Sequence, residues 1–280
     1  MTTPGAAPYL RPLGVGEVLD AGIKVTRSRF KDLAILVAVV TVPVQVLSAL
    51  VTISTTDEDT FDATGSTDTI GADFWTQQAG NLVVSLLGVV GTLIALAACT
   101  RIISGTYFGE RVDWKESLSY AARRLPSLLW VGFLFGLMVG LGTLACLAPG
   151  VWLFVAYSVS VPALLLEGTR GWAALRRSFR LVRRRWWPVF GIFLLGYLLI
   201  SIVQTVVTIP LIALLLSGVA DNLVVFFAGS AILGSVATIV TTPFLVAMIV
   251  IIYLDLRVRK EGLDLQLMAE RIGAPAPWPG

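Results

Sequence analysis

The strongest constraint on this chain is a series of six apolar stretches, each near the length needed to cross a lipid bilayer. About 20 apolar residues cover roughly 30 Å of hydrocarbon as a helix. Charged residues make up only 14% of the chain and hydrophobic ones 56%, whereas soluble domains carry about 25% charged residues. The sequence therefore predicts an all-α, polytopic membrane protein. The six predicted transmembrane helices cover residues 33–53, 82–104, 128–148, 151–166, 187–216 and 223–254.

These stretches divide the chain into a cytoplasmic arm (1–32), a membrane bundle (33–256) and a cytoplasmic tail (257–280). The third and fourth spans are separated only by Ala148-Pro149-Gly150, which predicts a tight antiparallel hairpin. The last two spans are longer than one straight crossing, so we expect them to tilt, kink or project beyond the bilayer. Prolines lie inside four spans, and they either shape the bundle or act as hinges. They are Pro43, Pro162, Pro210 and Pro243.

The basic residues fall on one side of this arrangement. All 21 lie before the first span, between the second and third, between the fourth and fifth, or after the sixth, counting Arg101 at the end of the second. Because cytoplasmic loops are enriched in Lys and Arg, we expect a cell (inner) membrane protein with both termini in the cytoplasm. The acidic loop 54–81 would then lie outside. It is expected to be solvated and flexible, with a weak cation site as the alternative.

A short amphipathic segment precedes the first, third and fifth spans, starting near residues 16, 115 and 172. We interpret this as a three-fold internal repeat of an interfacial helix and a hairpin. In the third copy, apolar residues recur at spacings of three and four, which places them on one helix face. They are Trp172, Leu175, Phe179, Val182 and Trp186. We expect this face in the acyl boundary and the arginines among lipid phosphates.

The arginines of this segment are the candidate contacts for anionic phospholipid: Arg176, Arg177, Arg180, Arg183, Arg184 and Arg185. Each basic residue near an anionic leaflet contributes about 1 kcal/mol to binding. The alternative is that they only orient the chain in the membrane. A membrane or cytoplasmic protein is the other partner class considered, and no nucleic acid is expected.

A few polar side chains suggest a pocket. Gln45 and Gln204 lie nearest the membrane midplane, where hydrogen bonds between helices are expected and a substrate contact is the alternative. Glu167 ends the fourth span and Asp255 the sixth, and each is followed closely by an arginine. Those arginines are Arg170 and Arg257. We expect ion-paired helix ends, with a headgroup or substrate pocket as the alternative.

Several chemistries lack their usual residues. The chain has no histidine, which removes the commonest zinc ligand and general base. It has no glycine loop followed by Lys-Ser/Thr, and no acidic residue in the middle of a span, which proton-coupled carriers need. We expect no enzymatic activity, cofactor or metal. Cys99 and Cys146 are expected to lie about 20 Å apart along the membrane normal, too far for a disulfide.

Parts of the chain resemble a known family. Residues 10–20, the central segments 161–167 and 174–182, and the ending 253–265 are similar to bacterial, especially actinobacterial, proteins of the "glycerophosphoryl diester phosphodiesterase membrane domain" family. The family takes its name from members in which such a bundle is fused to a phosphodiesterase domain, which is not recognisable here. The resemblance implies a role near lipid metabolism and no activity of its own.

Three function classes remain open. The first is a non-enzymatic accessory or scaffold protein linked to membrane lipid or envelope processes. The second is a transporter or lipid-translocating protein with a site between kinked helices, and the third is an intramembrane enzyme. A large cavity lined by Gln45 or Gln204 would favour transport, whereas a tightly packed bundle would favour a scaffold.

Overall fold

The computed structural model describes residues 13–55, 72–108, 110, 112–169, 171–216 and 223–262, and every regular element among them is a helix. Six helical segments are long and apolar enough to cross a membrane. This confirms the prediction of an all-α, multi-pass membrane protein. The helices are α1 (Val15–Ser28), α2 (Phe30–Thr55), α3 (Ala72–Phe108), α4 (Trp114–Arg123), α5 (Leu125–Ala145), α6 (Leu147–Tyr157), α7 (Ser160–Glu167), α8 (Trp172–Val182), α9 (Trp186–Leu216) and α10 (Leu223–Glu261).

A single 3₁₀ turn, Arg183–Arg185, joins α8 to α9 and is called the arginine turn below. The three short helices expected before the first, third and fifth spans are present as α1, α4 and α8. Their origin in an internal repeat stays a prediction. Two helices are longer than expected. Helix α3 already begins at Ala72, so the end of the acidic loop is helical, while the loop's residues 56–71 lie outside the described part.

Helix α10 extends to Glu261, beyond the predicted end of the sixth span. Ion pairs at i,i+4 spacing join Asp255 to Arg259 and Arg257 to Glu261 in this extension. Such pairs stabilise helices. Helices α2, α9 and α10 remain continuous through Pro43, Pro210 and Pro243.

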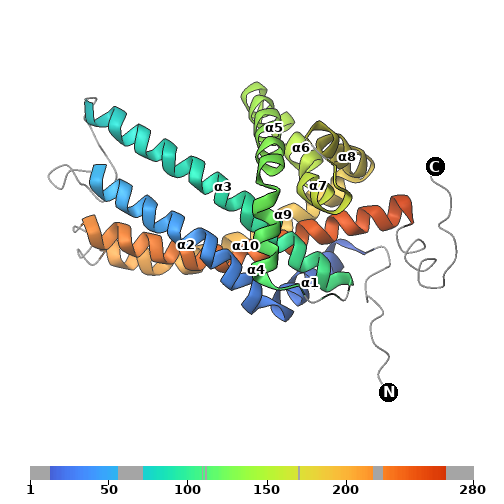
Figure 1. Ribbon diagram of the computed structural model, residues 1–280, viewed down its shortest axis with the longest axis horizontal. Coiled ribbons are helices and arrows are strands. Elements are labelled where there is room, and N and C mark those ends of the chain that lie inside the picture. Colours follow the sequence, from blue (N-terminus) through green and yellow to red (C-terminus); the bar gives the residue numbers. More distant parts are fainter. Residues whose placement is uncertain are drawn as a thin grey trace, which may run out of the picture.

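The long helices pack side by side, α2 against α3 and α10, and α10 against α9, while α5 stands at a steep angle to α2 and α3 (Figure 1). Their burial is uneven along their length. The core gathers the first turns of α2, the last turns of α3 and α10, and helices α1, α7 and α8. Far from that core, Leu50 of α2 is 58% exposed and Ile232 of α10 is 65% exposed. These distal halves present the apolar surface that a bilayer requires.

The turn between the third and fourth spans was predicted at Ala148-Pro149-Gly150, but the structure has it earlier in the chain, at Cys146. Cys146 alone is extended, with φ −173° and ψ 156°, and α6 begins at Leu147. Pro149 therefore lies in the first turn of a helix, where its missing N–H removes no hydrogen bond. A Cβ on Gly150 would lie 2.9 Å from the Thr143 Cα. The two arms of this hairpin thus meet backbone to backbone.

A second break separates α6 from α7 at Ser158 and Val159, so the fourth predicted span is two short helices. Helix α8 runs alongside both, in the opposite direction. The Ser178 hydroxyl donates to the Ala156 carbonyl at 2.9 Å, and the Trp186 indole donates to the Trp152 carbonyl at 3.2 Å.

This antiparallel packing brings the apex of the α5–α6 hairpin to the arginine turn. Ala148 lines a cavity of about 460 Å³ together with Arg183, Arg184 and Arg185. The sequence-based topology placed residues 148–150 and the arginines on opposite sides of the membrane, and the structure contradicts that separation. The reason is that α6 has only 11 residues, or about 16 Å of helix, and α8 lies along it instead of beneath it.

Candidate functional site

A cluster of charged side chains joins the ends of α7, α8 and α10. We call it the paired cluster, and it consists of Glu167, Arg177, Tyr253, Arg257 and Glu261. Arg177 donates from Nε to Glu167 Oε2 and from Nη2 to Glu167 Oε1, both at 2.7 Å. Its guanidinium also binds Glu261. The Tyr253 hydroxyl donates to Glu167 Oε1 at 2.6 Å, and Arg257 Nε donates to Glu261 Oε2 at 3.2 Å.

The fold places each member of this cluster. Gly168, with φ 68°, ends α7 in the left-handed conformation that glycine adopts freely. The Glu167 carboxylate therefore lies at a helix end, beside Arg177 on α8. The side chains of Glu167 and Arg177 are each only 16% exposed. A fork-shaped guanidinium that meets a carboxylate with two bonds is a strong, orienting contact. The paired cluster therefore fixes α8 on α7 and α10.

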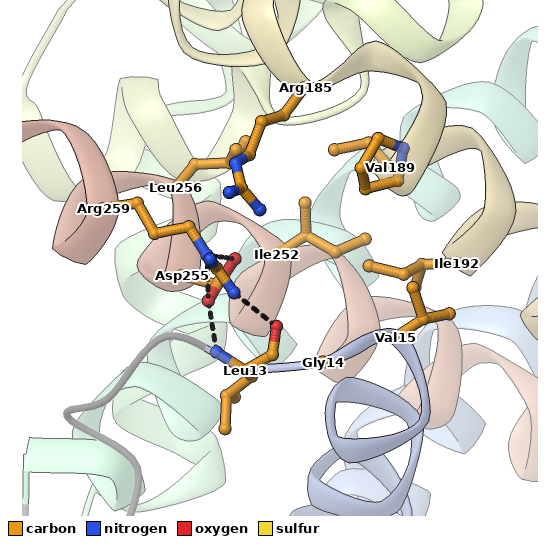
Figure 2. A pocket seen from close by; sticks show the side chains of 11 residues that line it. Leu13, Gly14, Val15, Arg185, Val189, Ile192, Ile252, Asp255, Leu256 and Arg259 are labelled. Carbon is orange, nitrogen blue, oxygen red and sulfur yellow. Dashed lines mark hydrogen bonds and ion pairs between the residues drawn. The ribbon is translucent and has the colours of Figure 1, made fainter.

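A second pair ties the segment before α1 to α10. Figure 2 shows Arg259 between Asp255 and the backbone of Leu13. The Leu13 N–H donates to Asp255 Oδ1 at 2.8 Å, and Arg259 Nη2 donates to the Leu13 carbonyl at 2.6 Å. These residues line a cavity of about 210 Å³, into which the Arg185 side chain is directed from the other side.

Ion-paired helix ends were predicted at Glu167 and Asp255, and the structure has them, but with other partners. Glu167 binds Arg177, and the expected partner Arg170 lies outside the described residues. Asp255 binds Arg259 instead of Arg257, because residues four apart share a helix face and residues two apart do not. Sequence spacing could have identified Arg259 and Glu261. Nothing local identified Tyr253, whose partner is 86 positions away.

The six candidate lipid contacts have three different environments. Arg177 belongs to the paired cluster, and Arg176 is exposed elsewhere on α8. The other four line one cavity of about 640 Å³, together with Arg259 and Lys260 of α10. We call it the basic cavity. It is lined by Arg180, Arg183, Arg184, Arg185, Arg259 and Lys260.

The charges of the basic cavity are poorly compensated. Arg259 is bound to Asp255, and Lys260 donates to the Arg180 carbonyl at 2.6 Å. Among the described residues, no carboxylate pairs with Arg180 or with any residue of the arginine turn. Like charges held this close repel one another. An anion with several oxygens would relieve that repulsion.

The apolar face of α8 is not free to enter lipid as expected. Leu175 and Val182 are buried, and so are Ala174, Ser178 and Leu181 beside them. The Phe179 ring packs edge-on against Trp152 of α6, with centroids 5.6 Å apart. Only Trp172, at the start of the predicted face, is exposed. Helices α6, α7 and α10 cover this face.

The arginine turn has aromatic neighbours. The 460 Å³ cavity that it shares with Ala148 is also lined by Trp152, Trp186 and Trp187. Indole rings favour the membrane–water interface, where one side of the ring is apolar and the N–H is wet. The turn therefore combines guanidinium groups, which suit phosphate oxygens, with rings that suit the upper acyl region.

Gln45 and Gln204 do not form one pocket. Gln204 lines a hollow of about 590 Å³, and the described residues that line it all belong to α9, between Tyr197 and Ile212. Gln45 lies against α10, with its Nε2 3.6 Å from where a Cβ on Gly234 would be. A hollow on the face of one helix is not a passage between helices.

Neither cysteine takes part in a disulfide, since Cys99 is buried and free and Cys146 is exposed and free. This agrees with the expectation that they stay unlinked. Within the part of the chain that the structure describes, no group of three or more His, Cys, Asp or Glu side chains could hold a metal ion.

Comparisons with protein-family models, with curated proteins and with solved structures gave no match. The resemblance to the phosphodiesterase membrane-domain family therefore stays a prediction.

Proposed function

We propose that this protein is a non-catalytic accessory or scaffold protein of the cell membrane, with both termini cytoplasmic, that holds anionic phospholipid at its basic cavity. The observation that supports it is a cavity of about 640 Å³ walled by six basic residues, of which four arginines have no carboxylate partner in the described structure. Arginine binds phosphate oxygens with two parallel hydrogen bonds and remains charged at every physiological pH. A phosphodiester headgroup fits both the charge and the size of this site.

The position of the cavity supports a lipid over a soluble anion. The arginine turn directly precedes α9, one of the helices able to span a membrane. Trp186 and Trp187 begin that helix beside the turn. A headgroup bound at the turn would therefore have its acyl chains next to apolar surface, and its binding energy would combine charge with hydrophobic burial.

Transport or lipid translocation is the second candidate. It is favoured by the prolines inside α2 and α9, which could act as hinges. Against it, every described residue that lines the hollow containing Gln204 belongs to α9. A binding site between helices is what a carrier needs, so the accessory role is the better supported of the two.

The test is lipid retention by the purified protein. The variant Arg183→Gln/Arg184→Gln/Arg185→Gln removes the turn's charge, and native mass spectrometry measures bound phosphatidylglycerol. At about 1 kcal/mol for each arginine, affinity should fall roughly 100-fold.

A charge-matched control separates the site from general attraction. Lys31, Arg123 and Arg176 are exposed, lie outside the basic cavity and have no carboxylate partner in the described chain. Their triple Gln variant should retain phosphatidylglycerol as the parent does. If both variants lose phosphatidylglycerol equally, the arginines attract anionic lipid only through their general charge and the basic cavity is not a specific site. If the arginine-turn variant loses none, the proposal is overturned.

A further inference from the structure

A second groove lies between α1, α9 and α10, away from the basic cavity. Its volume is about 610 Å³. One wall is formed by the end of α1 and the start of α2, with Ile23, Thr26, Arg27 and Phe30. The opposite walls come from α9 and α10, and among the described lining residues they are apolar except for Thr241: Leu199, Ile200, Ile202 and Val203 of α9, and Val240, Thr241 and Phe244 of α10. The Thr241 hydroxyl donates to its own helix at the Ala237 carbonyl. The described lining of the groove is therefore mostly apolar, and Arg27 of α1 is the charged residue in it.

The rotation of α1 creates this groove. Val18, Ala21, Gly22 and Thr26 are its buried residues, and a Cβ on Gly22 would lie 3.6 Å from the Phe244 ring of α10. Two large apolar side chains beside this contact are left outside the core. Ile23 is 50% exposed and Phe30 is 41% exposed. Ile23 and Arg27 of α1 and Phe30, the first residue of α2, line the same groove, so the Arg27 charge lies beside apolar side chains.

Arg27 also differs from Lys24 and Arg29, the cations nearest to it in the sequence. Lys24 binds Asp20 at 2.7 Å, and Arg29 lies 3.4 Å from Asp32. Arg27 is exposed and has no carboxylate partner among the described residues. Beside it, Thr26 is only 8% exposed, and its hydroxyl has no hydrogen-bond partner among the described residues. A buried hydroxyl without a partner is destabilising.

We propose that this groove holds one acyl chain of a phospholipid, with the lipid phosphate on Arg27 and the glycerol ester region beside Thr26. The apolar walls match a hydrocarbon chain, the unpaired guanidinium matches a phosphate, and the volume lies in the range of small-molecule sites. A second copy of this chain fits less well. A two-fold interface places the same patch on both subunits, which would bring one Arg27 toward the other.

This site is independent of the basic cavity, because the two share no lining residue. Its occupancy can therefore be tested by itself. Val203→Trp fills the groove with an indole ring. Leu194→Trp is the matched control, since Leu194 is an exposed α9 residue outside the groove. Native mass spectrometry of the full chain, loaded with a phosphatidylglycerol and phosphatidylcholine mixture, counts the lipids retained.

Three results are expected. Val203→Trp retains one lipid fewer than the parent, and Leu194→Trp retains the same number. Arg27→Gln keeps a lipid in the groove, but its preference for phosphatidylglycerol over phosphatidylcholine falls about fivefold, while Arg123→Gln changes nothing. Palmitate and inorganic phosphate, added separately, should compete weakly, because each supplies only half of the contacts.

Other results overturn the inference. One is an unchanged lipid count in Val203→Trp, provided that thermal unfolding shows the variant to be folded. Another is a parental dimer that Val203→Trp dissociates, which would assign the groove to a second copy. Loss of headgroup preference in the arginine-turn variant but not in Arg27→Gln would also contradict it, while leaving the proposed function intact.

Discussion

Arg177 and the three arginines of the arginine turn lie only a few residues apart in the sequence, yet their environments are opposite. Arg177 is mostly buried and bound to both Glu167 and Glu261. Arg183, Arg184 and Arg185 are exposed, and no carboxylate of the described chain pairs with them. The difference lies in what α7 and α10 present to each position. A paired arginine holds helices together, whereas an unpaired one remains available to an external anion.

The largest expected effect concerns where the unpaired group lies. Cys146 at the hairpin apex is exposed and Cys99 is buried, so an impermeant maleimide should modify only Cys146 in the folded protein. Ala148 and the arginine turn share a cavity. Cys146 in the parent protein should therefore label from the same side of sealed vesicles as the new cysteine in the double variant Arg184→Cys/Cys146→Ser. Labelling from opposite sides would restore the sequence-based topology.

The next effect concerns the paired group. Arg177→Gln leaves two carboxylates, Glu167 and Glu261, without their main partner in a mostly buried position. Removing one member of a buried ion pair costs about 3 kcal/mol, so the folded state should melt well below the parent. The reaction of buried Cys99 with a thiol probe during heating, in a Cys146→Ser background, reports the unfolding. Arg176→Gln is the control, and an equal melting temperature for Arg177→Gln would show that the paired cluster does not stabilise the fold.

A smaller loss is expected at the aromatic member of the paired cluster. Tyr253→Phe keeps the buried ring but removes the 2.6 Å hydrogen bond to Glu167. A bond to a charged group contributes about 1.5–3 kcal/mol, and Arg177 still holds the carboxylate, so the lower end applies. The same thiol assay measures it. A change as large as that of Arg177→Gln would mean that the tyrosine, and not the guanidinium, organises the cluster.

The smallest effect on stability is expected at the unpaired group. Arg184→Gln removes an exposed charge with repulsive neighbours, so the unfolding free energy should change by no more than about 0.5 kcal/mol. Relief of repulsion makes a slight stabilisation the expected sign. A clear destabilisation would reveal a structural partner for Arg184 and weaken the comparison.

The sequence predicted the helical class, the six apolar segments and the three short helices, because length and periodicity are local properties. It misplaced the hairpin turn, since a proline is tolerated in the first turn of a helix and Pro149 occupies that position. The environment of Arg177 could not be predicted, because Glu261 is 84 positions away. The basic cavity could be predicted only in part. The sequence identified its arginines as candidates, but their association with Lys260 depends on how α8 packs on α10.

We propose that the unpaired arginine turn selects an anionic headgroup without supporting the fold. The direct measurement is the ratio of phosphatidylglycerol to phosphatidylcholine retained from an equimolar mixture, compared between the parent and Arg183→Gln/Arg184→Gln/Arg185→Gln, with thermal unfolding recorded on the same samples. We expect a strong preference for phosphatidylglycerol in the parent, a large loss of that preference in the variant and no fall in melting temperature. An unchanged lipid ratio in a variant that melts like the parent would contradict it.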